Sequence, residues 1–447
     1  MDNKRNSTST VSVSDRQDGD QSEKQSKSGS FKDGLSFHMA SFFLVAQMAG
    51  AGFLALPKAF SDSGWLGLPM LVLFCGSVTF AATRLGRSWV LLEQRWPQYK
   101  DKCRSPYMEI AFRALGIWGR RICLASVTVT LGGNTTVYII LIAQFLFALT
   151  DGALSTCAFV CIVGACIMPF TWLGSPKDFW QTQILAVVAT LVACIVIFVQ
   201  LLVDDANGVF DDHEPEYRNP TLSTFSLGFG AILFAFGGSS VFPTVQNDMA
   251  DKSQFWKSAV LGFSVILCMY LPVSIAGYTL IGYGVDSNIM LAVTQNIAIK
   301  IAIGLQIINL IGTYIISFNP VAQAFEDVLN IPNSFNWKRV VMRSSIVVLE
   351  VVICLAIPDF SLIINLIGGS ATTICTFVLP PLMYIKLCDM KGNWPKVSLP
   401  LWERVYLIEI IIVGILGGVC ATVSAAYAII QNAFDKSCFT SFNDCCA

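Results

Sequence analysis

Runs of about 20 apolar residues recur along almost the whole chain, and each is long enough to cross a hydrocarbon core of roughly 30 Å. Apolar residues make up 54% of the 447 residues and charged residues only 13%, against about 25% charged in an average soluble domain. The sequence therefore predicts an all-α polytopic membrane protein with eleven transmembrane helices. The expected spans are residues 36–59, 65–92, 122–149, 154–173, 180–203, 222–245, 258–282, 295–324, 340–358, 361–386 and 404–430.

The loop charges predict the orientation of these spans. With the N-terminus in the cytosol, most of the 29 lysines and arginines lie on the cytosolic side, as the positive-inside rule requires. An odd number of spans then leaves the C-terminus extracellular or luminal. We expect a disordered cytosolic tail over residues 1–34, a transmembrane transporter domain over residues 35–430 and a short outer tail over residues 431–447. The chain shows no basic patch of the kind that nucleic-acid binding needs.

The C-terminal cysteines would lie in an oxidising compartment in this orientation. A disulfide among Cys438, Cys445 and Cys446, or between one of them and Cys157 in an outer loop, is one interpretation. Flexible free thiols are the other, and the sequence does not decide between them.

Residues 48–57 read MAGAGFLALP, in which Gly50, Gly52 and Ala55 match the G-x-G-x-x-G/A turn of dinucleotide enzymes. That turn must follow a strand and needs an acid about 20 residues later. Here it lies inside an apolar run, and residues 66–80 contain no Asp or Glu. No cofactor is therefore expected. The small residues predict either a helix that unwinds in mid-membrane or a close contact between two helices.

Residues 234–243, FAFGGSSVFP, repeat this layout in the sixth expected span. The distance from Gly52 to Pro57 equals that from Gly238 to Pro243. The two spans are the first and the sixth, so each opens a block of five, and the second block is inverted in the membrane. Interrupted spans at corresponding places of two inverted halves indicate a transporter binding site. We therefore favour unwound helices, and a 5+5 inverted repeat plus one extra helix.

Each unwound helix would present unpaired backbone groups at the midplane. N–H groups that begin the outer half of the first span suit a carboxylate, and carbonyls that end the outer half of the sixth suit an ammonium, so together they suit a zwitterion. The expected substrate contacts are Gln47, Gly50, Ala51, Gly52 and Phe53 in the first span and Ala235, Phe236, Gly237, Gly238, Ser239 and Ser240 in the sixth.

Several stretches resemble the amino acid/auxin permease family, of the wider APC group with the LeuT-type fold. They are GAGFLALPKAFSDSGW, ILFAFGGSSVFPTVQNDM, SPYMEIAFRALGIWGRR, GGNTTVYIILIAQ and PFTWLGSPKDFW, and the resemblance covers residues 35–430. It implies an eleven-span amino acid transporter that works by alternating access, coupled to H⁺ or Na⁺ or exchanging substrates. It also implies that Asn134, Tyr138, Asn309, Thr313 and Ser317 line the site.

The evidence for sodium coupling is mixed. Sodium-coupled members of this family are expected to carry an Asn where this chain has Ala46. Thr313 and Ser317 remain candidate ligands, because they lie one helical turn apart on one face. Sodium coupling is therefore weakened but stays open.

Proton coupling is slightly favoured, although its carrier is open. Proton-coupled members often carry a histidine where this chain has Phe43. His38 lies at the inner edge of the first span, where a solvated role is favoured over a proton-carrying one. Glu350, near the middle of the ninth span, is either a proton carrier or a hydrogen-bonded helix contact.

The function predicted from these features is secondary active transport of neutral amino acids. The alternative is a receptor that binds an amino acid and signals through its serine-rich N-terminal tail. An enzyme is not expected, because the sequence holds no H-E-x-x-H, nucleophile elbow or metal cluster. The expected partners are the amino acid, co-transported H⁺ or Na⁺ and the lipid bilayer, in the plasma membrane or an endolysosomal or vesicular membrane.

Overall fold

The computed structural model describes residues 34–100, 103, 105–172, 180–210, 215–332, 336–395, 397–433 and 438–439. The expected N-terminal tail lies outside these residues except for Gly34, and so do Cys445 and Cys446. Within the described ranges the regular structure is helical, and a parallel bridge between Leu35 and Met249 is the one β-type pairing.

Fifteen α-helices follow one another along the described chain. They are α1 (Phe37–Met48), α2 (Gly52–Ser63), α3 (Gly67–Arg95), α4 (Pro106–Leu149), α5 (Thr156–Trp172), α6 (Trp180–Ala206), α7 (Leu222–Ala235), α8 (Phe242–Asn247), α9 (Phe255–Ile281), α10 (Ile289–Ala292), α11 (Ile297–Val328), α12 (Trp337–Ala356), α13 (Phe360–Ile367), α14 (Leu379–Asp389) and α15 (Leu401–Ala433). Two π-helical turns, Gly368–Thr372 and Ile374–Val378, connect α13 to α14 as one helical run.

The all-helical membrane architecture predicted from the sequence is confirmed. Seven helical stretches of the described chain are long and apolar enough to cross a membrane, and α1, α5 and α7 are shorter apolar helices. Each expected span coincides with one helix or with a pair of helices. Because not every one of them meets the length and apolarity of a full crossing, the count of eleven spans stays a prediction.

The outer surface of the bundle is apolar, as a bilayer requires. On α15, for example, Leu416, Val419 and Val423 are 64%, 59% and 63% exposed. Soluble monomers rarely expose continuous apolar surface on this scale. In a membrane the same faces contact lipid chains, and the side chains that pack inward form the core.

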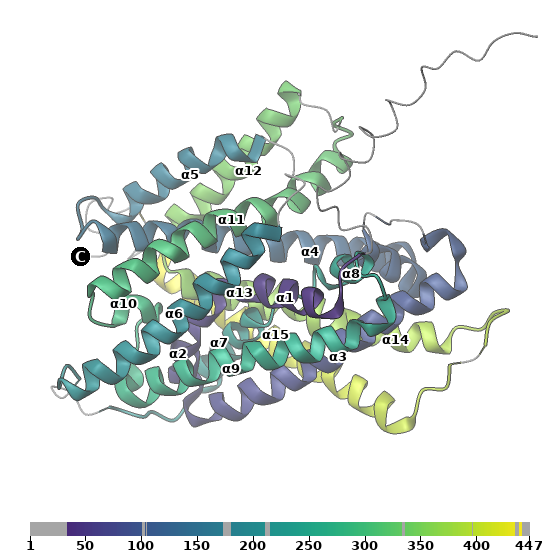
Figure 1. Cartoon of the computed structure of the whole chain (residues 1–447), viewed down its shortest axis with the longest axis horizontal. Coiled ribbons are helices and arrows are strands. Elements are labelled where there is room, and N and C mark those ends of the chain that lie inside the picture. The colour runs from purple at the N-terminus through teal and green to yellow at the C-terminus, as the bar shows by residue number, and fades with distance from the viewer. Residues whose placement is uncertain are drawn as a thin grey trace, which may run out of the picture.

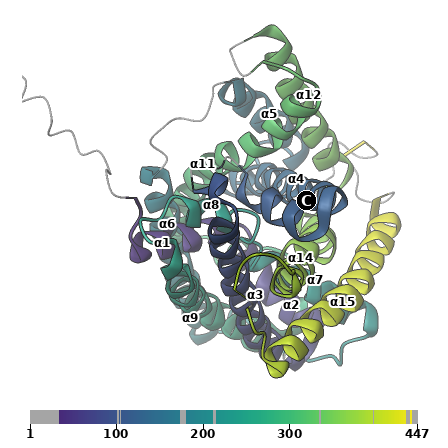
Figure 2. The ribbon, with the colours of Figure 1, turned by 90° about the vertical axis from the view of Figure 1, so that its right-hand side faces the viewer.

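The interrupted helices lie in the middle of the molecule (Figure 1). The main packing partner of α2 is α7. Both α4 and α6 pack against α11, and α1 packs against α9. Figure 2 shows α5 and α12 together at one edge and α15 at another. The first and sixth expected spans are therefore surrounded by other helices, which is where unwound backbone is tolerated in a membrane.

A disulfide joins Cys157 at the start of α5 to Cys438, beyond the end of α15, with their Cα atoms 5.9 Å apart. The N–H of Cys438 also donates to the carbonyl of Leu355 on α12. Of the alternatives that the sequence left open, the structure therefore has the bridge to Cys157. It ties the end of the described chain to the α5–α12 edge.

Candidate functional site

The first expected span is interrupted at the small residues singled out in the sequence. α1 ends at Met48, and Ala49 leaves the helical conformation with φ −74° and ψ 51°. α2 begins at Gly52 without a side-chain cap at Ala51, so its first N–H groups have no helical partner. The interruption predicted from the sequence is confirmed, although its role in binding stays a prediction.

The sixth expected span is interrupted in the same way. α7 ends at Ala235, and the next helix, α8, begins at Phe242 and has only six residues. Pro243 lies in the first turn of α8, where its missing N–H removes no helical hydrogen bond. The intervening residues include Gly237, Gly238, Ser239 and Ser240.

The two interruptions lie in direct contact. A Cβ placed on Gly52 would come within 2.6 Å of the Cα of Ala235, and one placed on Gly238 within 2.8 Å of the Cγ of Met48. Only glycine permits this approach. The start of α2 and the ends of α1 and α7 therefore meet at one point inside the bundle.

A tyrosine hydroxyl connects two of these helix ends. The hydroxyl of Tyr270, on α9, donates to the carbonyl of Met48 at 2.8 Å and lies 3.5 Å from the carbonyl of Ala235. The ring is fully buried and packs against Phe53 and Phe236. Since each helix C-terminus carries a partial negative charge, this point favours a positively charged group.

Further polar side chains surround the end of α1. Thr190 on α6 donates to the carbonyl of Ala49 at 2.7 Å. Asn309 on α11 donates to the side-chain oxygen of Gln306 at 3.0 Å, and the hydroxyl of Thr313 is 2.9 Å from the carbonyl oxygen of Asn309 and 3.1 Å from its side-chain oxygen. These oxygens already accept hydrogen bonds from the protein.

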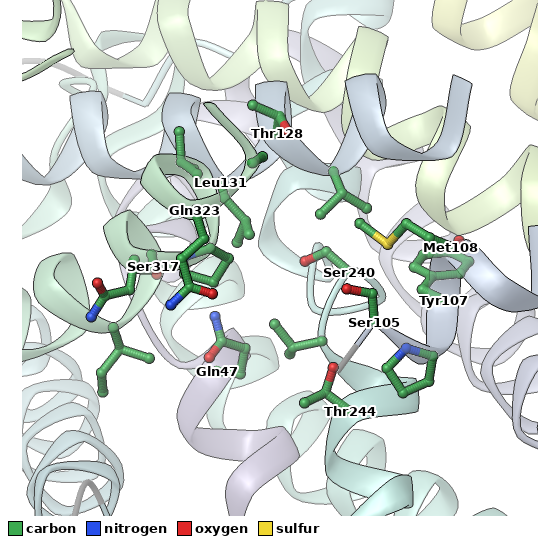
Figure 3. Close-up of a pocket in the computed structure, with 18 of the residues that line it drawn as sticks. Gln47, Ser105, Tyr107, Met108, Thr128, Leu131, Ser240, Thr244, Ser317 and Gln323 are labelled. Atoms are coloured by element: carbon green, nitrogen blue, oxygen red, sulfur yellow. The ribbon is translucent and has the colours of Figure 1, made fainter. Parts of the chain in front are cut away.

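A cavity of about 580 Å³ opens beside the interruptions (Figure 3). Of the expected site residues, Gln47, Ser240 and Ser317 line it. Its walls come from α1, α4, α6, α8 and α11 and from the segments next to them, and none of its lining residues belongs to α2 or α7. The cavity therefore reaches the interruptions from the side of α1 and α8.

The structure places the remaining expected residues at different distances from the two interruptions. Tyr138 on α4 faces Gly50, since a Cβ there would be 3.3 Å from the tyrosine oxygen. Asn134 is buried on the same helix. Ser239 donates to Thr376 at 3.2 Å. His38 is exposed at the start of α1 and stacks on Phe37, so it lies away from the interruptions.

Glu350 lies outside the cavity, between three helices. It is buried on α12 and contacts the hydroxyl of Thr135 on α4 at 2.6 Å and that of Tyr314 on α11 at 2.7 Å. Both of its neighbours are adjacent in sequence to expected site residues, Asn134 and Thr313. Its hydrogen bonds suit the helix-contact interpretation, and its closeness to α4 and α11 keeps a coupling role open.

Sequence reasoning missed three residues: Thr190 and Tyr270, which contact the first interruption, and Gln183, which lines the cavity. Each is a polar residue inside an apolar run, which is the only signal that the sequence offers. Many other serines, threonines and tyrosines share that signal, so only the packing of helices that are distant in sequence selects these three.

The fold is that of known membrane transporters. It is similar to the inward-facing conformation of Mhp1, with a TM-score of 0.50, 16% identity and coverage of 89% of this chain and 90% of that one. It is also similar to a mutant of the Eremococcus coleocola manganese transporter, with a TM-score of 0.50, 14% identity and coverage of 89% and 87%. These likenesses concern the fold alone, which is of the LeuT type.

The family follows from the sequence comparison. The family model described as "Transmembrane amino acid transporter protein" matches residues 33–429, so this chain belongs to that family. Two relatives from Arabidopsis thaliana are amino acid transporters AVT1B and AVT1C. AVT1B is 27% identical over 89% of this chain and 72% of its own length, and AVT1C is 27% identical over 86% and 68%. The resemblance stated from the motifs is thus confirmed.

Proposed function

We propose that this chain is a secondary active transporter of neutral amino acids, and not an enzyme, that binds its zwitterionic substrate at the interruptions of the first and sixth spans. The observation that carries the proposal is the meeting of three half-helix ends beside a cavity. Opposite helix ends attract opposite charges. An α-amino acid carries both charges a short distance apart, so it suits this arrangement without any ionised side chain.

The substrate carboxylate binds the free N–H groups at Ala51, Gly52 and Phe53, at the start of α2. The ammonium binds the carbonyls at the end of α7, those of Ala235 and Phe236. The remaining proposed contacts come from neighbouring elements and are Gln47, Gly50, Asn134, Tyr138, Gly237, Gly238, Ser239, Ser240 and Asn309.

Alternating access is supported by the one-sided cavity. Its walls include the half-helices α1 and α8, and not their counterparts α2 and α7. This is the arrangement expected of an inward-open state if the N-terminus is cytosolic. The Cys157–Cys438 disulfide supports the same orientation, because disulfides persist in extracellular and luminal compartments.

Proton coupling is favoured over sodium coupling by the hydrogen bonds around α1. A sodium site needs several free oxygens. Here the carbonyl of Ala49 accepts from Thr190, and the hydroxyl of Thr313 is turned to the oxygens of Asn309. Glu350 is the proposed proton site, with His38 as a weaker candidate, and Thr313 and Ser317 are the candidate ligands of the alternative ion, sodium.

Uptake into proteoliposomes tests this function. Radiolabelled amino acids are supplied one at a time with no gradient, a Na⁺ gradient or an inward H⁺ gradient. We expect uptake that responds to the H⁺ gradient. Gly52→Val should abolish it, because the side chain would collide with Ala235. Gly304→Val on α11 is the matched control, since a Cβ there meets nothing within 4 Å.

Two outcomes of this experiment contradict the proposal. Uptake that survives Gly52→Val would place the binding site elsewhere. Binding without uptake in the unmodified protein would favour the receptor function instead. One contact supports that alternative: Leu35 is paired through its backbone with Asp248 and Ala250, next to the cavity-lining helix α8. The first described residues of the chain therefore lie beside the cavity.

A further inference from the structure

Asp204, near the C-terminal end of α6, is a buried acid that the proposed function does not use. The residue is only 1% exposed, whereas the next one, Asp205, is exposed. One carboxylate oxygen accepts from the side-chain NH₂ of Gln200 at 2.7 Å, and the other accepts from the backbone N–H of Thr294 at 2.9 Å. Within the described residues Asp204 forms no ion pair. Two neutral donors therefore hold this carboxylate in place.

The bond from Gln200 belongs to a chain of hydrogen bonds whose direction is fixed. The N–H of Ile299 donates to the side-chain oxygen of Asn296 at 2.9 Å, and the NH₂ of Asn296 donates to the side-chain oxygen of Gln200 at 2.6 Å. A backbone N–H can only donate. Neither amide can therefore reverse without placing two donors against each other, and the chain must end on an acceptor, Asp204.

Only the ionised form of Asp204 accepts fully from both donors. The carboxylate has two accepting oxygens, whereas protonation places an O–H on one of them. That oxygen faces either Gln200 or Thr294, so one of the two bonds is weakened or lost. Thr294 and Asn296 are exposed, and a proton can reach the carboxylate from the solvent beside them. The contact between α6 and Thr294 is therefore sensitive to protonation.

Thr294 belongs to residues 289–296, which contain α10 and lead into α11; we call this segment the outer cover. Ile289 and Met290 are fully buried in it, and α10 packs against α2 (Figure 1). A Cβ placed on Gly277 would lie 2.8 Å from Pro57 of α2 and 3.2 Å from Ile289, so these two side chains are neighbours. The outer cover therefore lies on the half-helix α2, none of whose residues lines the cavity.

Other charged and titratable groups lie on the elements around Asp204. Lys300 on α11 pairs with Asp151, in the turn before α5. Exposed acids on α6 and before α10 are Asp205 and Asp286. The titratable groups of α1 and α9, which also pack against α6, are His38, Lys257, Cys268, Tyr270 and Tyr278. In the described part of the chain, Asp204 is the one titratable group with a hydrogen bond to the outer cover.

We propose that Asp204 is a positioning residue, which holds the outer cover on α2 while it is ionised and releases the cover when it is protonated. The proposal rests on the proposed function for the orientation, which places the end of α6 and the outer cover on the extracellular or luminal side. Release of the cover exposes α2 to that side, and the start of α2 is the proposed site of the substrate carboxylate. Acid in the outer compartment then favours loading of the substrate from there.

Cysteine labelling of the full chain in proteoliposomes tests the inference. Met290→Cys places a thiol under the outer cover. Ile297→Cys, at a position that is 79% exposed, measures how many molecules present this side to a charged, impermeant thiol reagent. Each is combined with Asp204→Asn, which replaces one accepting oxygen by a donor, or with Asp205→Asn, the matched control one residue away.

We expect Asp204→Asn to speed the labelling of Met290→Cys about fivefold at about pH 7.5, as the loss of one hydrogen bond allows. Asp205→Asn should change it less than about twofold, because surface substitutions have small effects. Gln200→Leu is a second variant, which removes one bond of Asp204 and keeps the acid, and it should also speed labelling. If neither Asp204→Asn nor Gln200→Leu speeds labelling, the inference is overturned.

The pH dependence separates this role from a merely structural one. As the buffer is lowered to about pH 4.5, labelling with Asp204 intact should approach that with Asp204→Asn, because both then lack the second acceptor. Comparing the same thiol in the two chains at each pH cancels the effect of pH on the thiol itself. A ratio between the two chains that stays constant over the whole range would contradict control by protonation.

The labelling needs no transport, so its result is separate from that of the uptake experiment. Uptake of an amino acid with equal labelling in all chains would leave the proposed function and overturn this inference. Labelling that follows Asp204, in a protein that neither binds nor carries any amino acid, would support the release of the cover and contradict the proposed function. Labelling of Met290→Cys only from the side of the N-terminus would overturn the outer position of the cover.

Discussion

At the scale of single residues, the most informative contacts are hydrogen bonds. In them, side-chain hydroxyls donate to backbone carbonyls at the two interruptions. A helix that stops inside a membrane leaves carbonyls without N–H partners, and water is not available there to replace them. Thr190 supplies the donor at Ala49, and Tyr270 adds a second donor at Met48, whose carbonyl also accepts from the N–H of Gly50. The interruption of the first span is thus stabilised by side chains of two other helices.

Tyr270→Phe should lower stability, since it removes one of the two donors to the buried carbonyl of Met48, the other being the N–H of Gly50. We expect a loss of about 0.5–1.5 kcal/mol in the free energy of unfolding, the net contribution of one hydrogen bond. Tyr278→Phe on the same helix is the control, because its hydroxyl has no partner in the described residues, and a change within about 0.5 kcal/mol is expected. Thermal unfolding of both purified variants checks this. Equal effects would contradict a special role for Tyr270.

Glu350→Gln tests whether the buried carboxyl group carries the coupled proton. Glutamine keeps the size of the side chain and can still hydrogen-bond Thr135 and Tyr314, but it cannot gain or lose a proton at neutral pH. We expect uptake to lose its response to the H⁺ gradient while exchange of internal for external substrate continues. Both rates are measured in proteoliposomes. Gradient-driven uptake that persists would leave Glu350 as a helix contact.

At the scale of elements, the chain that precedes α1 is joined to the chain that follows α8. The N–H of Leu35 donates to the carbonyl of Asp248 at 2.8 Å, and the N–H of Ala250 donates to the carbonyl of Leu35 at 3.0 Å. The two half-helices that line the cavity, α1 and α8, are therefore connected at the ends that are farther along the chain from the interruptions. Gly34 permits this pairing with φ +74°, a conformation that favours glycine.

Gly34→Ala should weaken this connection. A Cβ there would lie 2.7 Å from the backbone nitrogen of Ala250, and overpacking of this kind costs about 1–3 kcal/mol. Gly152→Ala is the control: it also has a positive φ, but its nearest contact would be an ordinary 3.5 Å from Phe147. Thermal unfolding compares the two. A loss no larger for Gly34→Ala than for Gly152→Ala would show that the pairing adds little.

At the scale of the whole molecule, the cavity and the disulfide mark opposite ends. The cavity walls include Ser105 and Asp248 beside the described N-terminal end, whereas Cys438 is the next-to-last described residue. Figure 1 shows α8 and α5, the helix that begins next to Cys157, in different parts of the bundle. The proposed topology places these two features on opposite sides of the membrane.

Thiol labelling in sealed vesicles tests this two-sided arrangement. We expect Thr244→Cys, an exposed cavity position, to react with a charged, impermeant reagent from the side of the N-terminus. Cys157→Ser should free Cys438 and allow its labelling only from the opposite side. The parent chain supplies the background from its other cysteines. Labelling of both positions from one side would contradict the proposed topology.

The sequence was most informative about the interruptions and least informative about their surroundings. Gly52 and Gly238 were recognisable because small residues followed by proline weaken a helix wherever they occur. The contact between Gly52 and Ala235 was not predicted, because it joins residues that are far apart in the chain. Gln183, Thr190 and Tyr270 escaped notice because nothing local distinguishes them from other polar residues in apolar spans.

By itself the sequence determined the apolar helices, their approximate bounds, the two interruptions and the family. Each of these depends on residues close together in the chain, through hydropathy, helix propensity and motif spacing. Only the tertiary structure decided that Cys438 pairs with Cys157, that Glu350 contacts α4 and α11 outside the cavity, and which polar side chains line the cavity. Those properties arise from contacts between residues far apart in the chain, whose distances are set by the packing of whole helices.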